Sequence, residues 1–220
     1  MHPLFLVVLH PFAPHRQTLR DLIATGDQIL MIQGILSGTL SFIFNQYDGS
    51  KPFSEIVKMA KDQGYTEPDP REDLSGQDVM RKLVILAREA GLKIETSDVQ
   101  VESLVPKELQ NIPVEEFMQR LPEMDSAMTA KISTAHKQKQ ILRFVATLHP
   151  DGRARVGLES LPATHAFSAV SGTDNIVLFK TTRYEKQPLV IQGPGAGPAV
   201  TAAGVFADLL RLAQYLGALP

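Results

Sequence analysis

The 220-residue sequence contains no cysteine, and its six histidines follow none of the spacings that bind metal ions. Without cysteine the chain has no disulfide, no catalytic thiolate and no cysteine-ligated zinc site. This composition agrees with a reducing compartment, so we expect a cytoplasmic protein. Motifs such as H-E-x-x-H are absent as well. We therefore expect each histidine to be structural or exposed, and we expect no metal site.

The sequence also lacks a strong charge of either sign and a long hydrophobic run. It has 22 basic and 24 acidic residues, a formal net charge of −2 and no polybasic block, which argues against a nucleic-acid partner. The short basic cluster at 131–139 is interspersed with neutral residues and is expected to be a solvated helix face. The apolar run Leu4–Leu9 is too short to cross a bilayer and follows no basic residue, so we expect neither a membrane anchor nor a secretory signal.

Hydrophobic residues make up 44% of the chain, which is enough for a core in one large domain or two small ones. The first half favours helices, and the second half favours strands separated by turn residues. This distribution predicts an α+β fold built on one mixed or antiparallel sheet, with helices on one face. The expected helices are 17–24, 39–47, 54–63, one that ends near 89, 115–120, 124–136 and 199–215, and the expected strands are 28–34, 141–148, 153–161 and 175–183.

The stretch Gly64–Lys82 (GYTEPDPREDLSGQDVMRK) is the most chemically loaded part of the chain. Its two prolines fix their own φ angles and push the residues before them out of the α region. The segment Thr66–Arg71 is therefore expected to be an extended, rigid loop that can aim its side chains. We expect the next helix to begin near Asp73 or Ser75, because either residue could cap it.

Asp78 and Lys82 lie one turn apart on that helix, beside the apolar stripe that begins with Val79 and Leu83. A partly buried lysine next to a carboxylate is a tunable acid–base group, because burial lowers its pKa and the carboxylate raises it. The same spacing also fits a surface ion pair worth a few tenths of a kcal/mol. Spacing alone leaves both interpretations open.

Three motifs together resemble the homoserine dehydrogenase family. They are the 64–82 stretch, the upstream segment Gly34–Phe44 (GILSGTLSFIF), and the downstream glycines Gly193-Pro-Gly-Ala-Gly197 followed by Thr201-Ala-Ala-Gly204-Val. The resemblance covers about Gln17 to Leu216 in the expected order. It is closest to the dehydrogenase portion of the fused aspartate kinase/homoserine dehydrogenase enzymes.

The resemblance implies a reversible, NAD- or NADP-dependent interconversion of homoserine and aspartate semialdehyde, a step shared by threonine, isoleucine and methionine synthesis. It places Lys82 on the lysine that exchanges a proton with the substrate oxygen, which is sensible because hydride delivery to an aldehyde builds negative charge there. Glu67 and Asp78 fall on carboxylates that hold the substrate amino group and orient the lysine, and Asp73 falls on a further acidic position of the site. The resemblance also implies a homodimer formed through this domain.

A dinucleotide-binding βαβ unit with G-x-G-x-x-G is missing from the sequence. We therefore expect 1–16 to be an unmatched segment, 17–197 to be the substrate-binding, catalytic and dimerisation domain, and 198–220 to be a helix that packs on an absent Rossmann domain. The turn with Gly193, Gly195 and Gly197 has Pro198 where a third fingerprint glycine would fall, so it is no independent Rossmann unit. By resemblance, this turn closes the cofactor cleft from the substrate side.

Two further hypotheses remain open at this level. The chain could be a non-catalytic module that dimerises or binds an amino acid, and we expect the isolated chain to have little or no activity because its cofactor domain is missing. A metal-assisted hydrolase that uses Glu67, Asp69, Glu72 and Asp73 is weaker, because no recognised motif supplies a nucleophile or base.

Overall fold

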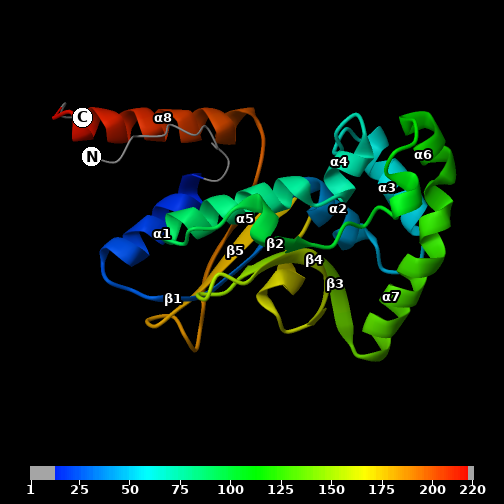
Figure 1. Cartoon of the computed structure of the whole chain (residues 1–220), viewed down its shortest axis with the longest axis horizontal. Coiled ribbons are helices and arrows are strands. Elements are labelled where there is room, and N and C mark those ends of the chain that lie inside the picture. The colour runs from blue at the N-terminus through cyan, green and yellow to red at the C-terminus, as the bar shows by residue number, and fades with distance from the viewer. Residues whose placement is uncertain (1–12, 218–220) are drawn as a thin grey trace.

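A computed structural model describes residues 13–217 of the chain, so most of the unmatched segment lies outside the described residues. Figure 1 shows one curved sheet with helices packed on it. The α-helices are α1 (Ala13–Ala24), α2 (Gly38–Gln46), α3 (Phe53–Asp62), α4 (Pro70–Leu74), α5 (Gln77–Glu89), α6 (Val114–Arg120), α7 (Asp125–Lys137) and α8 (Pro198–Tyr215). The strands are β1 (Ile29–Ile35), β2 (Val99–Val101), β3 (Gln140–Leu148), β4 (Ala154–Pro162), β5 (Asp174–Thr181) and β6 (Leu189–Pro194).

The six strands form one sheet in the order β2-β4-β3-β1-β5-β6. Only the β2–β4 pair is parallel, and the other pairs are antiparallel. The expected α+β fold with a mixed sheet is confirmed. The sequence pattern did not predict β2 or β6 as strands. β1 lies centrally, so the segment that follows it emerges between two neighbouring strands.

Most of the hydrophobic core lies between the sheet and the helices of one face. Side chains from α2 and α5 pack there against β3, and α2 also packs against β5. Within residues 13–217, six phenylalanines are less than 2% exposed. Full burial of each such ring stabilises the fold by about 2–3 kcal/mol relative to an exposed ring. A smaller core lies on the opposite face, where Phe167 and Val170 from the β4–β5 connection pack on Val145 and Ile176.

The site helix α5 begins at Gln77, two residues after Ser75, and its N-cap is Gly76. The sequence missed α4, the short helix before it. Asp69 is the N-cap of α4, because its carboxylate accepts a hydrogen bond from the Arg71 backbone N–H, and Pro70 occupies the first turn. Both preferences are common at helix starts. The expected extended loop therefore ends at Asp69, and Gly76, with a φ of 73°, separates α4 from α5.

α8 confirms the expected C-terminal helix but leaves large apolar side chains in solvent. Phe206 is 60% exposed and Leu209 is 54% exposed. Figure 1 shows this helix set apart from the sheet, to which β6 connects it. Within residues 13–217, no helix has both the length and the apolar character needed to cross a membrane.

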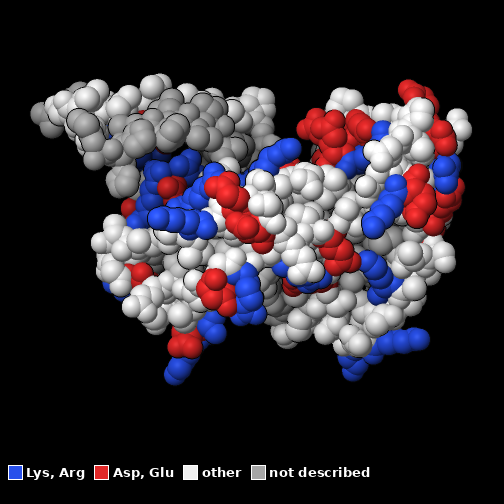
Figure 2. Space-filling view, viewed as in Figure 1, with Lys and Arg blue, Asp and Glu red and all other residues white. Residues whose placement is uncertain are grey.

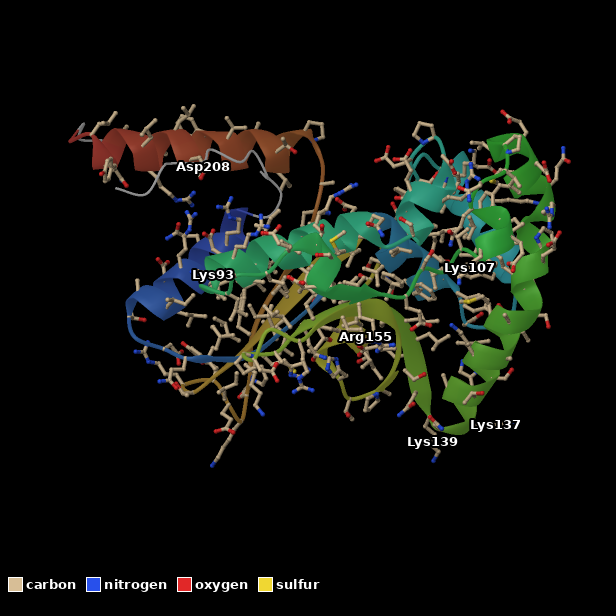
Figure 3. The ribbon with its side chains drawn as sticks, in the orientation of Figure 1. Lys93, Lys107, Lys137, Lys139, Arg155 and Asp208 are labelled. Atoms are coloured by element: carbon tan, nitrogen blue, oxygen red, sulfur yellow. The ribbon has the colours of Figure 1, made fainter. Side chains whose placement is uncertain are left out.

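The basic cluster at 131–139 lies at the end of α7 and in the turn before β3. Lys131, Lys137 and Lys139 are all exposed, and Figure 3 shows Lys137 and Lys139 at the tip of this turn. The expected solvated face is therefore confirmed.

Candidate active site

Lys82 points from α5 toward the end of β1. Its ammonium donates a hydrogen bond to the Leu36 carbonyl oxygen at 2.8 Å and forms an ion pair with Asp78 Oδ2 at 2.7 Å. The Lys82 side chain is 19% exposed, whereas the Asp78 side chain is 57% exposed. The predicted Asp78–Lys82 ion pair therefore forms, with the Lys82 side chain mostly shielded from solvent and the Asp78 side chain exposed. Its contact with a main-chain carbonyl 46 residues away gives the ammonium a fixed direction.

The loop before α4 is held in place by main-chain contacts. The Glu67 backbone N–H donates to Asp73 Oδ2 at 2.8 Å, and the Lys61 ammonium donates to the Pro68 carbonyl at 2.7 Å. Thr39, near the start of α2, donates its hydroxyl to the Tyr65 carbonyl. The Glu67 side chain itself stays exposed. The loop is therefore fixed while its outermost carboxylate faces solvent.

Asp73 is a predicted site residue that lies partly buried, and the pKa of its carboxyl group is raised. Burial raises its pKa, and the nearby negative charge of Glu67 raises it further, while the hydrogen bond from the Glu67 backbone N–H opposes both effects. A carboxyl group in this setting favours its neutral form more than a solvated aspartate does. A cationic ligand beside it would reverse that preference.

Asp69 belongs to the scaffold of the loop. Both its oxygens accept hydrogen bonds from the Arg71 guanidinium, the shortest at 2.7 Å, and this lowers the pKa of the carboxyl group. Arg71 also donates to the carbonyls of Leu109, Gln110 and Ile112. Within residues 13–217, no group of three or more acidic, histidine or cysteine side chains is arranged to hold a metal ion. The Asp69–Arg71 pair thus leaves the hydrolase hypothesis without structural support.

Figure 2 shows acidic side chains gathered over the loop that precedes α4, with further acidic side chains along α6. Glu67 and Glu72 of this region are exposed, and Asp73 lies partly buried beneath them. Clustered negative charge favours a cationic ligand, such as a protonated amino group.

The glycine turn lies at the same end of the sheet as Lys82. Gly193 pairs with Asn175 across β5 and β6, and Ile176 pairs with Ile35 across β5 and β1. The next residue of the chain, Leu36, carries the carbonyl that holds Lys82. Because neighbouring strands lie about 4.8 Å apart, the turn and the lysine anchor are separated by only two strand spacings, roughly 10 Å.

The glycine turn offers two features that fit a bound cofactor. A Cβ atom added at Gly195 would lie 2.0 Å from Asn175 Nδ2, so only glycine lets the main chain approach that side chain. Asn175 is 1% exposed, and its Oδ1 finds no hydrogen-bond donor within residues 13–217. A buried polar atom without a partner, next to a main-chain cradle, is the kind of environment that a polar ligand completes.

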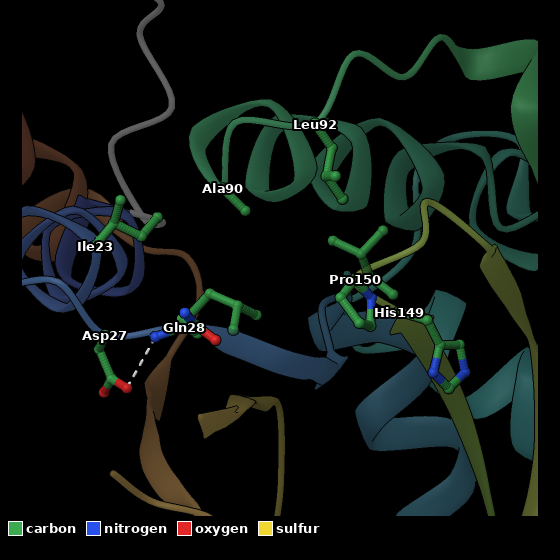
Figure 4. A pocket seen from close by; sticks show the side chains of 9 residues that line it. Ile23, Asp27, Gln28, Ala90, Leu92, His149 and Pro150 are labelled. Atoms are coloured by element: carbon green, nitrogen blue, oxygen red, sulfur yellow. Dashed lines mark hydrogen bonds between the residues drawn. The ribbon is translucent and has the colours of Figure 1, made fainter. Parts of the chain in front are cut away.

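A separate pocket of about 220 Å³ lies at the other end of α5. It contains none of the predicted site residues. Figure 4 shows Asp27 beside it, with its carboxylate accepting from the Gln28 backbone N–H. Asp27 also accepts from Thr181, Thr182 and the Arg183 backbone, so its oxygens serve the fold. The pocket is lined by Ile23, Asp27, Gln28, Ile29, Ala90, Leu92, Leu148, His149 and Pro150.

The sequence pattern missed three groups at the candidate site. They are the Leu36 carbonyl, the Thr39 hydroxyl and the Asn175 carboxamide. Thr39 belongs to the 34–44 motif, and Asn175 is a polar residue at the start of an otherwise apolar strand. Those features were the available signals, but the register of the sheet was needed to place them together.

The chain has an α+β fold built on one mixed sheet, with a lysine–carboxylate pair anchored at the end of β1. The homoserine dehydrogenase family model matches residues 14–210, so the chain belongs to the homoserine dehydrogenase family. Members of this family use NAD or NADP.

Two curated relatives illustrate the match. The chain is 52% identical over 207 residues to chloroplastic bifunctional aspartokinase/homoserine dehydrogenase 2 of Zea mays, covering 93% of this chain and 23% of that protein. It is 47% identical over 214 residues to homoserine dehydrogenase of Paracoccidioides brasiliensis, covering 92% of this chain and 58% of that protein. The chain thus spans about a quarter of the first relative and somewhat more than half of the second.

Solved structures share the fold. A Candida auris protein of unknown function superimposes with a TM-score of 0.89 at 41% identity, covering 95% of this chain and 60% of that one. A homoserine dehydrogenase of Thiobacillus denitrificans gives a TM-score of 0.72 at 25% identity, covering 89% of this chain and 41% of that one.

Proposed function

We propose that this chain supplies the substrate-binding and catalytic part of a homoserine dehydrogenase. The reaction oxidises L-homoserine with NAD or NADP to L-aspartate 4-semialdehyde, releasing the reduced cofactor and one proton, and it is reversible. The observation that carries the proposal is the placement of Lys82, which the Leu36 carbonyl and Asp78 hold at the end of the central strand. Thr39, three residues after Leu36, contacts the acidic loop, and the glycine turn lies about two strand spacings from Leu36.

Lys82 is the proton-transfer group in this proposal. In the reducing direction its ammonium donates a proton to the aldehyde oxygen, where negative charge develops as hydride arrives. In the oxidising direction the neutral amine accepts the hydroxyl proton. The bond to Leu36 and the ion pair to Asp78 fix the lysine nitrogen, so that little reorganisation is needed at the moment of transfer.

Glu67, Asp73 and Asp78 bind the substrate ammonium group in this proposal. The exposed Glu67 attracts the cation, and the partly buried Asp73 contacts it where water is scarce. An ammonium near Asp73 stabilises the ionised carboxylate and so offsets the burial that raises its pKa. Binding therefore relieves an unfavourable charge of the ligand-free site.

The nicotinamide cofactor, when bound, accepts or supplies the hydride. We assign the main chain at Gly193, Gly195 and Gly197 to the substrate-side wall of its cleft, because the turn approaches the Lys82 end of the sheet. We further assign 17–197 to the substrate and dimerisation domain and 198–220 to a helix that packs on a nucleotide-binding domain. The exposed apolar side chains of α8 support that division.

The same proposal places the protein in threonine, isoleucine and methionine synthesis, as a cytoplasmic homodimer. Its plant relatives are described as chloroplastic. Cytoplasmic placement rests on the cysteine-free composition.

The test is a kinetic comparison of Lys82→Ala with Lys93→Ala. The chain is joined to the part of the Paracoccidioides relative that it does not cover, and homoserine-dependent reduction of NAD and NADP is followed by absorbance. Lys82→Ala should lower kcat by about 10²- to 10⁴-fold, the usual contribution of a positioned acid–base group. Lys93 is exposed and follows α5, so its substitution should leave kcat unchanged.

Near-normal turnover of Lys82→Ala would remove this lysine from the mechanism. If the unsubstituted hybrid folds and binds homoserine but does not turn over, the non-catalytic binding module becomes the better description of the chain.

A further inference from the structure

Asn175 is a buried amide whose side-chain carbonyl oxygen has no hydrogen-bond donor in the described part of the chain. It lies on β5 and is 1% exposed. A buried carbonyl oxygen without a partner costs about 1–3 kcal/mol. Hydrophobic side chains fill the same face of β5, so an amide at this position lowers stability relative to a hydrophobic side chain of similar size.

The position of Asn175 connects the two halves of the candidate site. Side chains alternate along a strand, so Asn175 shares the helix-side face with Val177 and Phe179 of the large core. The β1–β5 register places Ile35 opposite Ile176, so Leu36 follows opposite Asn175. Since adjacent strands are about 4.8 Å apart, the amide is a near neighbour of the carbonyl that holds Lys82.

The glycine turn covers this amide. A Cβ atom at Gly195 would lie 2.0 Å from Asn175 Nδ2 and 2.3 Å from its Cγ. Gly197, two residues on, has a φ of 126°, a conformation that side-chain-bearing residues rarely adopt. The turn therefore depends on glycine at two positions to lie against Asn175.

We propose that Asn175 binds the carboxamide of the nicotinamide ring, and that the turn Gly193–Gly197 closes over this contact. This inference rests on the proposed function. An asparagine side chain presents one acceptor and one donor group side by side, which matches a primary carboxamide in a paired, two-hydrogen-bond arrangement. The ammonium and carboxylate of homoserine offer only donors or only acceptors, so neither matches both atoms.

The pairing would also orient the reactive part of the ring. The carboxamide is attached to the ring carbon next to the one that carries the hydride. Anchoring it at Asn175 would hold the hydride-carrying carbon near the end of β1, where Lys82 is anchored. Asn175 is a binding residue in this account, and it takes no part in proton transfer.

The test uses the 220-residue chain itself and does not depend on turnover. The ¹⁵N-labelled protein is titrated with nicotinamide, and the side-chain amide signals of Asn175, assigned by their loss in Asn175→Asp, are followed by NMR. A saturable shift is expected with nicotinamide and a much weaker response with nicotinic acid, because the carboxylate can accept from Nδ2 but has no donor for Oδ1. The amide of Gln192 on the neighbouring strand donates to Asp174 and should not move.

The Asp variant should bind nicotinamide about tenfold more weakly, as expected for one lost hydrogen bond. Unchanged Asn175 signals, or equal shifts with nicotinic acid, would overturn the inference, and both results come from the unsubstituted chain, whether or not the variant folds. Lys82→Ala should retain the nicotinamide shift. Failure at Lys82 would therefore refute the proposed catalysis alone, and failure at Asn175 would refute this contact alone.

Discussion

Gly76 sets the start of the helix that carries Lys82, and we predict that Gly76→Ala strongly destabilises the protein. The residue has a φ of 73°, in the left-handed region. An added Cβ would lie 2.8 Å from Phe144 Cζ and 3.4 Å from Val156 Cγ1. Both side chains are buried in the core of the sheet, so neither can move aside easily.

Two costs combine at this position. The left-handed conformation costs a residue with a side chain about 1–2 kcal/mol, and overpacking a core adds about 1–3 kcal/mol. The expected loss in the free energy of unfolding is therefore about 2–5 kcal/mol. Gly91, just beyond the other end of α5, has a φ of 86° and nothing within 4 Å of its added Cβ. Gly91→Ala should show the backbone cost alone.

Urea unfolding followed by circular dichroism measures the difference. For an m value of about 1–3 kcal/mol/M, the Gly76 variant should unfold roughly 1 M urea earlier than the Gly91 variant. The hybrid enzyme with Gly76→Ala should also lose turnover, because a tilted α5 moves Lys82 away from Leu36. Equal destabilisation by the two substitutions would refute the packing argument at Phe144.

Two further predictions concern ionisation. Burial lowers the pKa of His15 to about 4, although a hydrogen bond with the Ile191 backbone opposes this shift. As the pH falls from about 6.5 to 4, the unfolded chain takes up a proton that the native protein does not. The free energy of unfolding should therefore fall by up to about 3 kcal/mol over this range. His15→Gln should remove this part of the pH dependence in urea unfolding, whereas His136→Gln, at an exposed position, should not. Parallel plots of stability against pH for the wild type and His15→Gln would contradict the prediction. Asp73→Asn should raise stability at neutral pH, because the raised pKa of Asp73 means that its ionised form disfavours the native state, an effect absent below the unfolded pKa. The affinity of the same variant for homoserine, measured by calorimetry, should fall. Asp62→Asn, at an exposed position, is the control. If Asp73→Asn is no more stable than this control at neutral pH, burial of the Asp73 carboxylate has no net cost.

The sequence predicted the elements with strong local patterns. The helix that carries Lys82 has a continuous apolar stripe, and the long strands are bounded by turn residues, so local physics determines both. β2 was missed because three residues are too few for an alternating pattern, and it forms only by pairing with β4. α4 was not predicted, although Asp69-Pro70 is itself a helix-start signal. The prolines were interpreted as favouring an extended loop throughout.

The candidate site was predictable as residue types and only partly as geometry. Asp78 and Lys82 lie on one helix, so their ion pair follows from the helical repeat. The contact between Lys82 and Leu36 depends on how α5 packs across the sheet, which no local pattern specifies. The partial burial of Asp73 likewise depends on the fold of the loop around it.

Main-chain groups hold three side chains of the candidate site in place. Lys82 is anchored by a carbonyl at the end of β1, Asp73 by a backbone N–H of the loop, and Asn175 is covered by the main chain at Gly195. Main-chain anchors tolerate changes in neighbouring side chains but depend on glycine wherever a Cβ would intrude. Substitutions at Gly76 and Gly195 should therefore impair the site more than substitutions of most charged residues around it, because they displace the backbone that positions Lys82 and Asn175.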